Sequence, residues 1–354
     1  MSYGKKVTLT LFGESHGEGI GAVVEGLPCG EVIDLVEVQR QLSRRAPGGN
    51  SLGTPRSETD QVEVMSGLFE GKVTGAPICG VIRNNNTRSR DYTPHLPRPS
   101  HADYAAHIKY KGCADYRGGG HFSGRITAGV VFAGSMASQI LARRGIYVGA
   151  HVTRIESVTD RSFEETDLTH EKFLDLQQSD LPVLTPEKET LMREAILSAK
   201  QEGDSVGGII ESAVIGVPSG VGAPFFDSVE SRISAMLFGI PAVKGISFGG
   251  GFDLCAKRGS QSNDSIITTP NGIATQTNNN GGITGGITNG MPIIVTTAIK
   301  PTPSISCEQS TVNIESGEQE KFSIKGRHDP CILPRAICVV EAAIALVILD
   351  LLEE

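Results

Sequence analysis

Runs in which apolar and polar residues alternate occur in both the first and the last parts of this chain, and longer helical patterns separate them. Alternation over four to eight residues is typical of half-buried strands. It predicts strands at 7–12, 22–26, 62–69, 76–83, 148–158 and 292–299. We therefore expect a protein that combines helices and strands in each half.

Helices are expected at 34–45, 126–144, 169–178, 186–201 and 335–352. Asp34, followed three residues later by Glu37, gives the capping-box pattern at the start of the first helix. The second and the last of these helices are apolar on nearly every side, which predicts that both are buried at the centre of the fold. Glu341 and Asp350 interrupt the last apolar run, so burial explains it better than a membrane span.

The second half of the chain repeats features of the first half in the same order. For example, VVEGLPCG at 23–30 is echoed by AVIGVPSG at 213–220. Such repetition predicts one domain over 1–354, built from two related halves about a pseudo-twofold axis. The halves are expected at about 1–150 and 205–354, around an insertion at about 151–204. Each match is short, so chance similarity is the alternative.

Charge and cysteine content limit the partners and the compartment. The chain has 354 residues, 32 Lys and Arg against 40 Asp and Glu, and a net charge of −8. This charge argues against nonspecific nucleic-acid binding. The seven cysteines form no CxxC and no Cys/His pair at metal spacing, which is typical of reduced thiols in the cytoplasm. The N-terminal apolar run is too short for a signal peptide, so we expect a cytoplasmic protein without a metal site.

A glycine triplet at 118–120 lies directly before the second long apolar pattern. Three residues without Cβ atoms allow backbone N–H groups to close on a ligand, and a helix starting near Ser123 would direct its positive end there. Arg117 and Arg125 flank the triplet, and a guanidinium pairs well with phosphate or carboxylate oxygens. The stretch predicts an anion site, and a mobile glycine turn is the alternative.

Two histidines and one aspartate in these polar segments suit proton transfer. His16 follows the first predicted strand, His101 follows Ser100, and Asp329 precedes the last helix. An imidazole titrates near neutrality and can donate or accept a proton. Ser100 with Asp103 also predicts a helix that begins at His101, so a local capping role is the other interpretation of that histidine. The residues alone therefore predict acid–base chemistry on a phosphorylated or carboxylated small molecule.

Eight motifs, in order and across nearly the whole chain, resemble those of the chorismate synthase family. They are GESHG at 13–17, RRAPG at 44–48, SHADY at 100–104, YRGGGHFSGR at 116–125, GSQ at 259–261, GGITGGITNG at 281–290, KPTPS at 300–304 and GRHDPC at 326–331. The resemblance implies conversion of 5-enolpyruvylshikimate 3-phosphate to chorismate by anti-1,4-elimination of phosphate and a proton. It also implies a need for reduced FMN, an α+β fold in which two antiparallel sheets enclose central helices as a β-α-β sandwich, and a homotetramer.

The same resemblance implies roles for individual residues. His16 would protonate the departing phosphate, His101 would lie by the pyrimidine edge of the flavin, and Asp329 would help the flavin N5 to accept the substrate proton. Arg45 and Arg125 would contact the anionic groups of the substrate, or of NADPH in members that reduce their own flavin. The residues implied to hold FMN are His121, Phe122, Ser123, Gly285, Lys300, Pro301, Thr302, Pro303, Ser304 and Arg327.

The chain departs from the commonest family pattern at three places. His121 and Phe122 stand where many members have Arg and Ser, Ala46 replaces a third consecutive arginine, and Pro303 replaces a serine. The first departure bears on FMN binding and the second on the use of NADPH. Two other functions remain open: a nicotinamide-dependent oxidoreductase that uses the glycines at 17–21, and a binding scaffold for phosphorylated metabolites.

Overall fold

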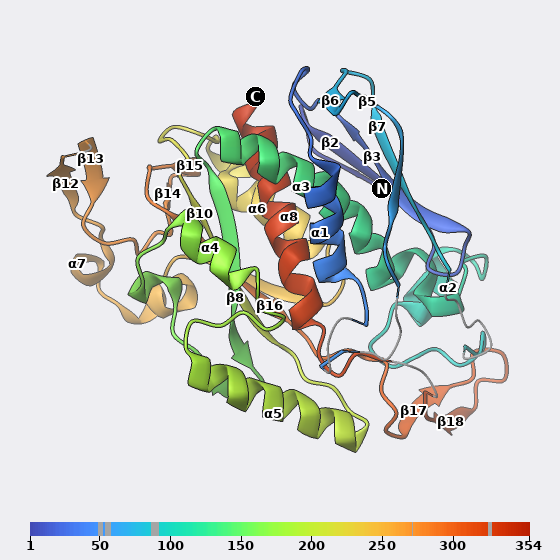
Figure 1. Cartoon of the computed structure of the whole chain (residues 1–354). Helices are drawn as coiled ribbons and strands as arrows, with labels where there is room; N and C mark the ends of the chain where they lie inside the picture. The colour runs from blue at the N-terminus through green and yellow to red at the C-terminus, as the bar shows by residue number, and fades with distance from the viewer. Residues whose placement is uncertain (49–51, 54–57, 86–91, 271, 325–327) are drawn as a thin grey trace.

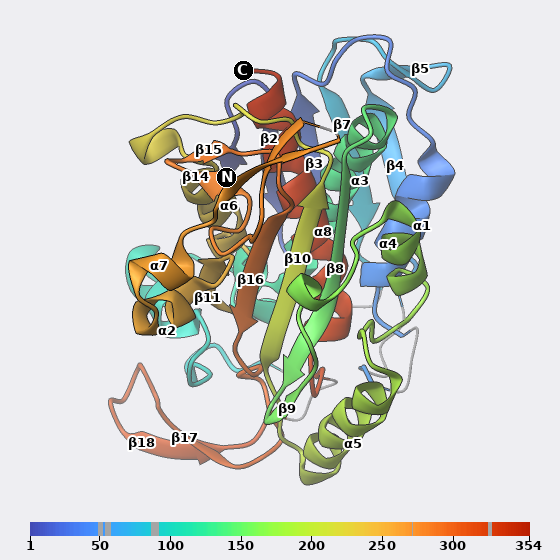
Figure 2. The ribbon, with the colours of Figure 1, turned by 90° about the vertical axis from the view of Figure 1, so that its left-hand side faces the viewer.

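Two five-stranded antiparallel sheets form the outer layers of the computed structural model, which describes residues 1–48, 52–53, 58–85, 92–270, 272–324 and 328–354 (Figures 1 and 2). The first sheet has the order β1 (Ser2–Tyr3), β2 (Thr8–Gly13), β3 (Gly19–Glu25), β7 (Ile78–Arg83), β4 (Val62–Ser66). The second has the order β11 (Val243–Phe248), β16 (Ile293–Ile299), β10 (Gly208–Ile215), β8 (Tyr147–Ile155), β9 (Val158–Thr159).

Two long helices, α3 (Thr127–Arg143) and α8 (Leu333–Leu352), lie between the sheets and pack against each other (Figure 1). α3 contacts β2 and β3, whereas α8 contacts β8 and β10. The helices approach closely because Gly134 has no side chain: a Cβ atom there would overlap Ala342. The stretch Gly124–Arg143 is long and apolar enough to cross a membrane, and 83% of its apolar window is buried inside the fold, as expected of a core helix.

The remaining elements surround this core. α1 (Leu35–Arg45) and α6 (Val229–Phe238) both pack on α8, and α4 (His170–Leu176) covers the outer face of the second sheet. The other helices are α2 (Asp103–Lys109), α5 (Pro186–Glu202) and α7 (Gly259–Ser262). The paired short strands are β5 (Leu68–Phe69) with β6 (Lys72–Val73), β12 (Ile266–Thr269) with β13 (Gly272–Thr275), β14 (Ile283–Thr284) with β15 (Ile287–Thr288), and β17 (Gln309–Val312) with β18 (Gln319–Phe322).

Asp350, near the end of α8, joins that helix to the first sheet and to α6. Its carboxylate accepts hydrogen bonds from the backbone N–H groups of Lys5 (3.0 Å), Lys6 (2.7 Å) and Val7 (2.8 Å). It also pairs with Arg232 of α6. The side chain is almost fully buried, so these partners compensate the loss of its hydration. The interruption of the apolar run at Asp350 therefore has a structural explanation.

The pattern of apolar residues predicted most elements, with errors at the start of α2 and in the strands expected at 62–69, which is divided into β4 and β5, and at 148–158. The α+β class is confirmed, and α1 begins after Asp34, whose side chain accepts a hydrogen bond from the N–H of Val36. The helix expected to begin at His101 begins instead at Asp103, and Ser100 does not cap it. Ser100 has a φ of +58°, and the carboxylate of Asp103 is bound by Arg98 and His101. The strand expected at 148–158 is also divided, into β8 and β9.

Candidate active site

His16 and His101, which are 85 positions apart in the sequence, lie against neighbouring glycines of one turn, Arg117–Phe122. This segment, called the glycine turn below, has positive φ angles at Gly118 (+62°) and Gly119 (+84°). A Cβ atom at Gly118 would be 2.7 Å from Nε2 of His16, and one at Gly119 would be 2.8 Å from Cε1 of His101. Glycine is therefore required twice, for the backbone conformation and for the space that the two imidazoles occupy.

The loop that carries His16 is held from two sides. The N–H of Ser15 donates to the carbonyl oxygen of Gly120 at 3.1 Å, which joins the loop to the glycine turn. The side-chain amide of Asn84, just after β7, donates to the carbonyl oxygens of Glu14 and Gly17, both at 2.9 Å. His16 itself is only 9% exposed. The imidazole is consequently fixed by its loop rather than free to reorient as a surface side chain would be.

His101 is oriented by its contact with the carboxylate of Asp103. Its Nδ1 lies 2.6 Å from Oδ1 of Asp103, whose carboxylate is also bound by Arg98 at 2.7 Å. Burial opposes ionisation of Asp103, but hydrogen bonds from Arg98 and His101 outweigh it and hold the pKa of that carboxyl well below its usual range. A carboxylate at this distance favours the tautomer with the proton on Nδ1, and Nε2 is then directed toward Gly119.

The segment Lys300–Ser304 connects the surroundings of His101 with those of Asp329. Nζ of Lys300 donates to the carbonyl oxygen of Ser100 at 2.6 Å, and Oγ of Ser304 accepts from Arg98 at 3.2 Å. On its other side, Oγ1 of Thr302 donates to the carbonyl oxygen of Asp329 at 2.8 Å. Burial, reinforced by the charge of Lys244, lowers the pKa of Lys300. The segment predicted to hold a cofactor thus lies between two of the three residues predicted to move protons.

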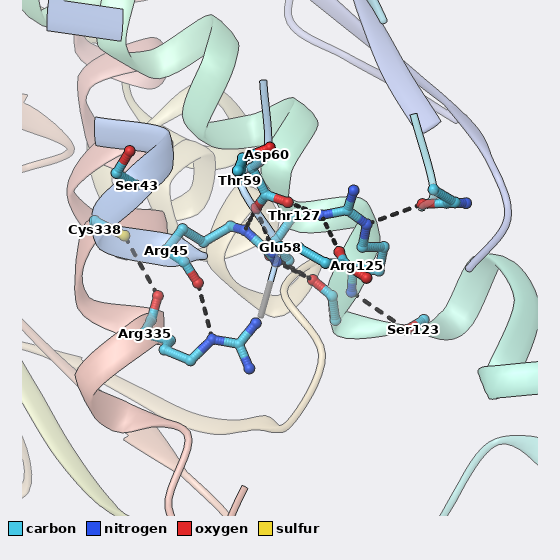
Figure 3. Close-up of polar contacts among 12 residues, drawn as sticks. Ser43, Arg45, Glu58, Thr59, Asp60, Ser123, Arg125, Thr127, Arg335 and Cys338 are labelled. Atoms are coloured by element: carbon cyan, nitrogen blue, oxygen red, sulfur yellow. Dashed lines mark hydrogen bonds and ion pairs between the residues drawn. The ribbon is translucent and has the colours of Figure 1, made fainter. Parts of the chain in front are cut away.

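Asp329 is paired with Arg335, in the first turn of α8. Nε of Arg335 also donates to the backbone carbonyl of Arg45 at 2.8 Å (Figure 3). Burial lowers the pKa of Arg335, although the nearby Asp329 opposes this effect. These contacts place Asp329 beside the end of α1, where Arg45 is the last helical residue.

Asp60 is the shared counter-ion of the two arginines predicted to contact anions (Figure 3). Its Oδ2 accepts from Nε and Nη2 of Arg45, at 3.0 and 2.7 Å, and its Oδ1 pairs with Arg125. Burial opposes ionisation of Asp60, yet Arg45 and Arg125 prevail and lower its pKa. Nη1 of Arg125 also lies 3.0 Å from the carboxylate of Glu58. Both guanidinium groups therefore sit in a buried ionic network before any ligand is considered.

A cavity of about 430 Å³ adjoins the glycine turn. Gly119 and Phe122 of that turn line it, together with Arg98 and Asp103, the two partners of His101. Its aromatic walls also include Tyr92, whose ring meets that of His16 edge-on with the centroids 5.4 Å apart. This volume is in the range of ligand pockets in proteins, and the lining combines aromatic surface with a guanidinium.

Not all of the predicted residues lie here. Phe122 lines the cavity, the ring of His121 lies 4.2 Å from that of Phe122, and Ser123 caps the turn before α3 by accepting from the N–H of Arg125. Gly285, in contrast, is an exposed residue between β14 and β15, on the opposite side of the molecule from α2 (Figure 1). Arg327 lies outside the described residues.

Several polar residues of this network were not predicted as site residues, among them Glu58, Asp60, Asn84, Arg98, Asp103 and Arg335. Asp103 belongs to the SHADY motif and Arg98 lies two residues before it, so their closeness to His101 in the sequence was the one available signal. Asp60 and Asn84 act through residues far away in the chain, and no local pattern marks such contacts. Among the described residues, no group of three or more metal-ligating side chains is arranged to hold a metal ion.

Comparison with known proteins agrees with this geometry. The family model described as chorismate synthase matches residues 7–352. The chain belongs to the chorismate synthase family. It is 45% identical over 350 residues to the chorismate synthase of Thermococcus kodakarensis, covering 98% of this chain and 96% of the relative. It is 44% identical over 349 residues to that of Methanobrevibacter smithii, covering 98% and 94%.

A solved structure titled "Crystal Structure of Chorismate Synthase" has a similar fold. The TM-score is 0.77 at 30% sequence identity, and the match covers 99% of this chain and 92% of that one. Together these matches make the chain a carbon–oxygen lyase of the shikimate pathway, as expected for a chorismate synthase family member.

Proposed function

We propose that this lyase converts 5-enolpyruvylshikimate 3-phosphate to chorismate, with loss of phosphate from one carbon and a proton from another. The observation that carries the proposal is the placement of His16 and His101 against Gly118 and Gly119 of one turn. The proposal also rests on the arginine network beside that turn, because the substrate bears a phosphate and two carboxylates. Proton transfer and anion binding then occur at one end of α3 and α8.

The residues around the cavity fit reduced FMN, the cofactor that the family resemblance implies. A planar ring system requires aromatic or apolar walls, which Tyr92 and Phe122 of the lining supply. Its phosphate requires donors, and Lys300 and Ser304, which contact Ser100 and the lining residue Arg98, would supply them from beside the cavity. When bound, reduced FMN would supply an electron transiently to a reaction without net oxidation. His101 would hold the protonation state of the ring that lies beside it, and Asp103 would fix the tautomer of His101.

His16 is proposed to donate a proton to the phosphate that leaves, and Asp329 to assist removal of the proton that the substrate loses. An imidazole suits the first task because it is partly protonated near neutrality. Asp329 suits the second because a carboxylate accepts a proton, and Arg335 holds it in position at the start of α8. Both side chains return to their starting state after one turnover, once His16 has taken up a proton from bulk water and the proton removed with the help of Asp329 has been released to it.

The arginines proposed to bind anionic groups are already paired within the protein. Arg45, Arg125 and Arg335 are paired with Asp60, Glu58 and Asp329, so the network carries no large net charge. To acceptors in the part of the chain that the structure describes, Arg45 and Arg125 each donate three of the five N–H groups of a guanidinium. We therefore propose that both arginines contact the anionic groups of the substrate, or of NADPH if the protein reduces its own flavin.

The finer features of the assembly belong to the same proposal. We infer that the fold is an internally duplicated β-α-β sandwich, since β2-β3-β7-β4 in one sheet and β8-β10-β16-β11 in the other follow the same pattern. We also infer a cytoplasmic homotetramer. Large apolar side chains on the side of the molecule that bears α7 and β12–β13 support association, because Phe252, Ile266 and Ile273 are each more than three-quarters exposed.

An anaerobic assay tests the activity. The protein is mixed with 5-enolpyruvylshikimate 3-phosphate and either reduced or oxidised FMN, and phosphate release is measured. Release with reduced FMN alone is the expected result. Hydride transfer from a nicotinamide to a substrate would instead support the oxidoreductase, and saturable binding without turnover would support the scaffold; either result contradicts the proposal.

A further inference from the structure

Within the described residues, the side chain of Asn84 connects the loop that carries His16 to the buried ionic network. We infer that Asn84 is a positioning residue: it sets the place of His16 relative to Arg125, and Asp60 fixes Arg125 in turn. This inference rests on the role proposed for His16. It assigns a task to a residue that touches neither the imidazole nor, in the proposed mechanism, the reacting atoms.

The hydrogen bonds of Asn84 leave only one orientation of its amide. Its Nδ2 faces two carbonyl oxygens, those of Glu14 and Gly17, and its Oδ1 faces Nε of Arg125 at 3.0 Å. A flipped amide would direct an acceptor at two acceptors and a donor at a donor. The backbone N–H of Asn84 also donates to the carbonyl oxygen of Glu18, at 3.1 Å. Asn84 therefore holds the loop on both sides of His16.

Arg125 is a rigid support for this amide. Its side chain is 4% exposed, and besides Asn84 it donates hydrogen bonds to Asp60 and to the carbonyl oxygen of Arg83 and forms an ion pair with Glu58. Burial lowers the pKa of Arg125 despite the nearby Asp60. Asp60, whose side chain is fully buried, is in turn bound to Arg45. The series Asp60, Arg125, Asn84 thus runs from the buried ion pairs to the backbone on either side of His16.

The glycine turn holds the opposite side of the same loop, through the bond from Ser15 to Gly120. If only one of these attachments were present, the loop could rotate about it. The hydrogen bond from Ser15 to Gly120 and those from Asn84, on opposite sides of the loop, together fix the direction of the imidazole. Proton transfer is sensitive to such direction, since a displacement of about 1 Å can cost a factor of about 100 in rate. The amide of Asn84 is therefore expected to influence kcat more than KM.

Asn84→Asp is the sharpest test, because the carboxylate keeps an acceptor for Arg125 and removes both donors to the loop. We expect kcat to fall by about 10- to 100-fold, with a change in KM below about threefold. Asn85→Asp is the matched control: it introduces the same charge at the next residue, which is exposed, and should change kcat by less than about twofold. Equal kcat values for Asn84→Asp and the parent protein would overturn the inference.

A double-mutant cycle shows whether Asn84 acts through His16. In a His16→Ala background, Asn84→Asp should lower kcat by less than about threefold, because the group that it positions is absent. Fully multiplicative losses would assign Asn84 to another step and reject the inference. If His16→Ala alone retains the parental rate, the role proposed for His16 fails, and that outcome is distinct from a failure of Asn84.

A measurement without turnover covers the case in which Asn84→Asp folds poorly. In Asn84→Ala, hydrogen exchange of a peptide spanning 14–18 should become at least about tenfold faster, while peptides from α8 remain protected. Unchanged exchange at 14–18 would show that Asn84 does not hold the loop, whatever the activity of the variant.

Discussion

The two sheets share an order of strands but differ in how equivalent strands are connected. β2 and β3 of the first sheet are joined by five residues, 14–18, which carry His16. β8 and β10 occupy the corresponding places in the second sheet, and there the connection is 156–207, which contains β9, α4 and α5. The short connection presents the side chain that we propose transfers a proton at the end of α3, whereas the long one covers the outer face of its sheet. A common framework therefore carries chemistry in one half and protection in the other.

Two buried histidines, one in each of these connected strand pairs, illustrate the difference between the two halves. His16 is 9% exposed in a loop, against a glycine turn and near a cavity. His151 is fully buried within β8, where Nε2 lies 2.8 Å from Glu211 and the ring packs against Phe163. Burial alone thus does not distinguish a catalytic histidine from a structural one. The surroundings distinguish them: His16 lies near a cavity that a ligand can enter, whereas His151 is enclosed by the packing of a sheet.

The largest expected effect is that of His16→Ala on turnover. Loss of a general acid costs about 10²- to 10⁴-fold in kcat, and we expect a loss in this range with the fold and flavin affinity retained. Steady-state phosphate release and flavin titration measure the two quantities. A variant with near-parental kcat would remove His16 from the mechanism and with it the functional contrast between the halves.

Glu211→Ala should give the opposite result in the second half. The carboxylate of Glu211 accepts from His151, from Oγ of Ser162 (2.6 Å) and from the N–H of Phe163 (2.6 Å). Removing it leaves these donors buried without an acceptor, so the free energy of unfolding should fall by about 3 kcal/mol. Urea denaturation measures the loss, and kcat of the folded fraction should stay within about twofold. A large loss of kcat at unchanged stability would mean that this cluster has a catalytic task.

Asp103→Asn tests the ion pair around His101 through its dependence on pH. Hydrogen bonds from Arg98 and His101, acting against burial, lower the pKa of Asp103 below the unfolded value of about 4. Its contribution, about 1.5–3 kcal/mol, is therefore complete above that value and is lost as the pH falls toward the folded pKa. The parent and the variant should differ in unfolding free energy at pH 7, and the difference should shrink progressively as the pH falls below about 4. A difference that persists unchanged in acid would contradict this account.

Gly134→Ala probes the contact between the central helices, which both halves share. The added Cβ would overlap Ala342 of α8, so we expect a loss of about 1–3 kcal/mol in unfolding free energy. Gly259→Ala in α7 is the control, since an added Cβ there has no neighbour within 4 Å among the described residues. Thermal unfolding of both variants measures the difference. Equal melting temperatures would show that the helix crossing adapts to the extra atoms.

The sequence predicted the framework better than the site. α3 and α8 were recognisable because their residues are apolar on nearly every side. A soluble protein buries such a helix in its core, since no side of it is suited to water. The start of α2 was misjudged at Ser100, because a cap depends on a free side chain and the carboxylate of Asp103 is bound elsewhere. Local rules fail where a distant residue competes for the same group.

Within the site, the glycine turn and the two histidines were identifiable from motifs, whereas Asp60 and Asn84 were not. Both act on partners that are remote in sequence: Asp60 binds Arg45 and Arg125, and Asn84 spans β7 and the loop after β2. Their positions follow only from the assembled fold, in which α1, α3 and the first sheet meet. Contacts of this kind are seen only in the three-dimensional structure, because polar residues that are far apart in one sequence form no recognisable pattern.

The bonds from Lys5, Lys6 and Val7 to Asp350 also bear on how the protein is made. α8 packs on the inner face of the second sheet and is one of the two central helices. It nevertheless follows every strand in the order of synthesis. During translation the inner face of the second sheet must stay uncovered until α8 has left the ribosome, whereas α3, which contacts the first sheet, is made much earlier. A nascent chain stalled before residue 333 should therefore depend on chaperones that shield such faces, and release of the helix would complete the fold in one late step.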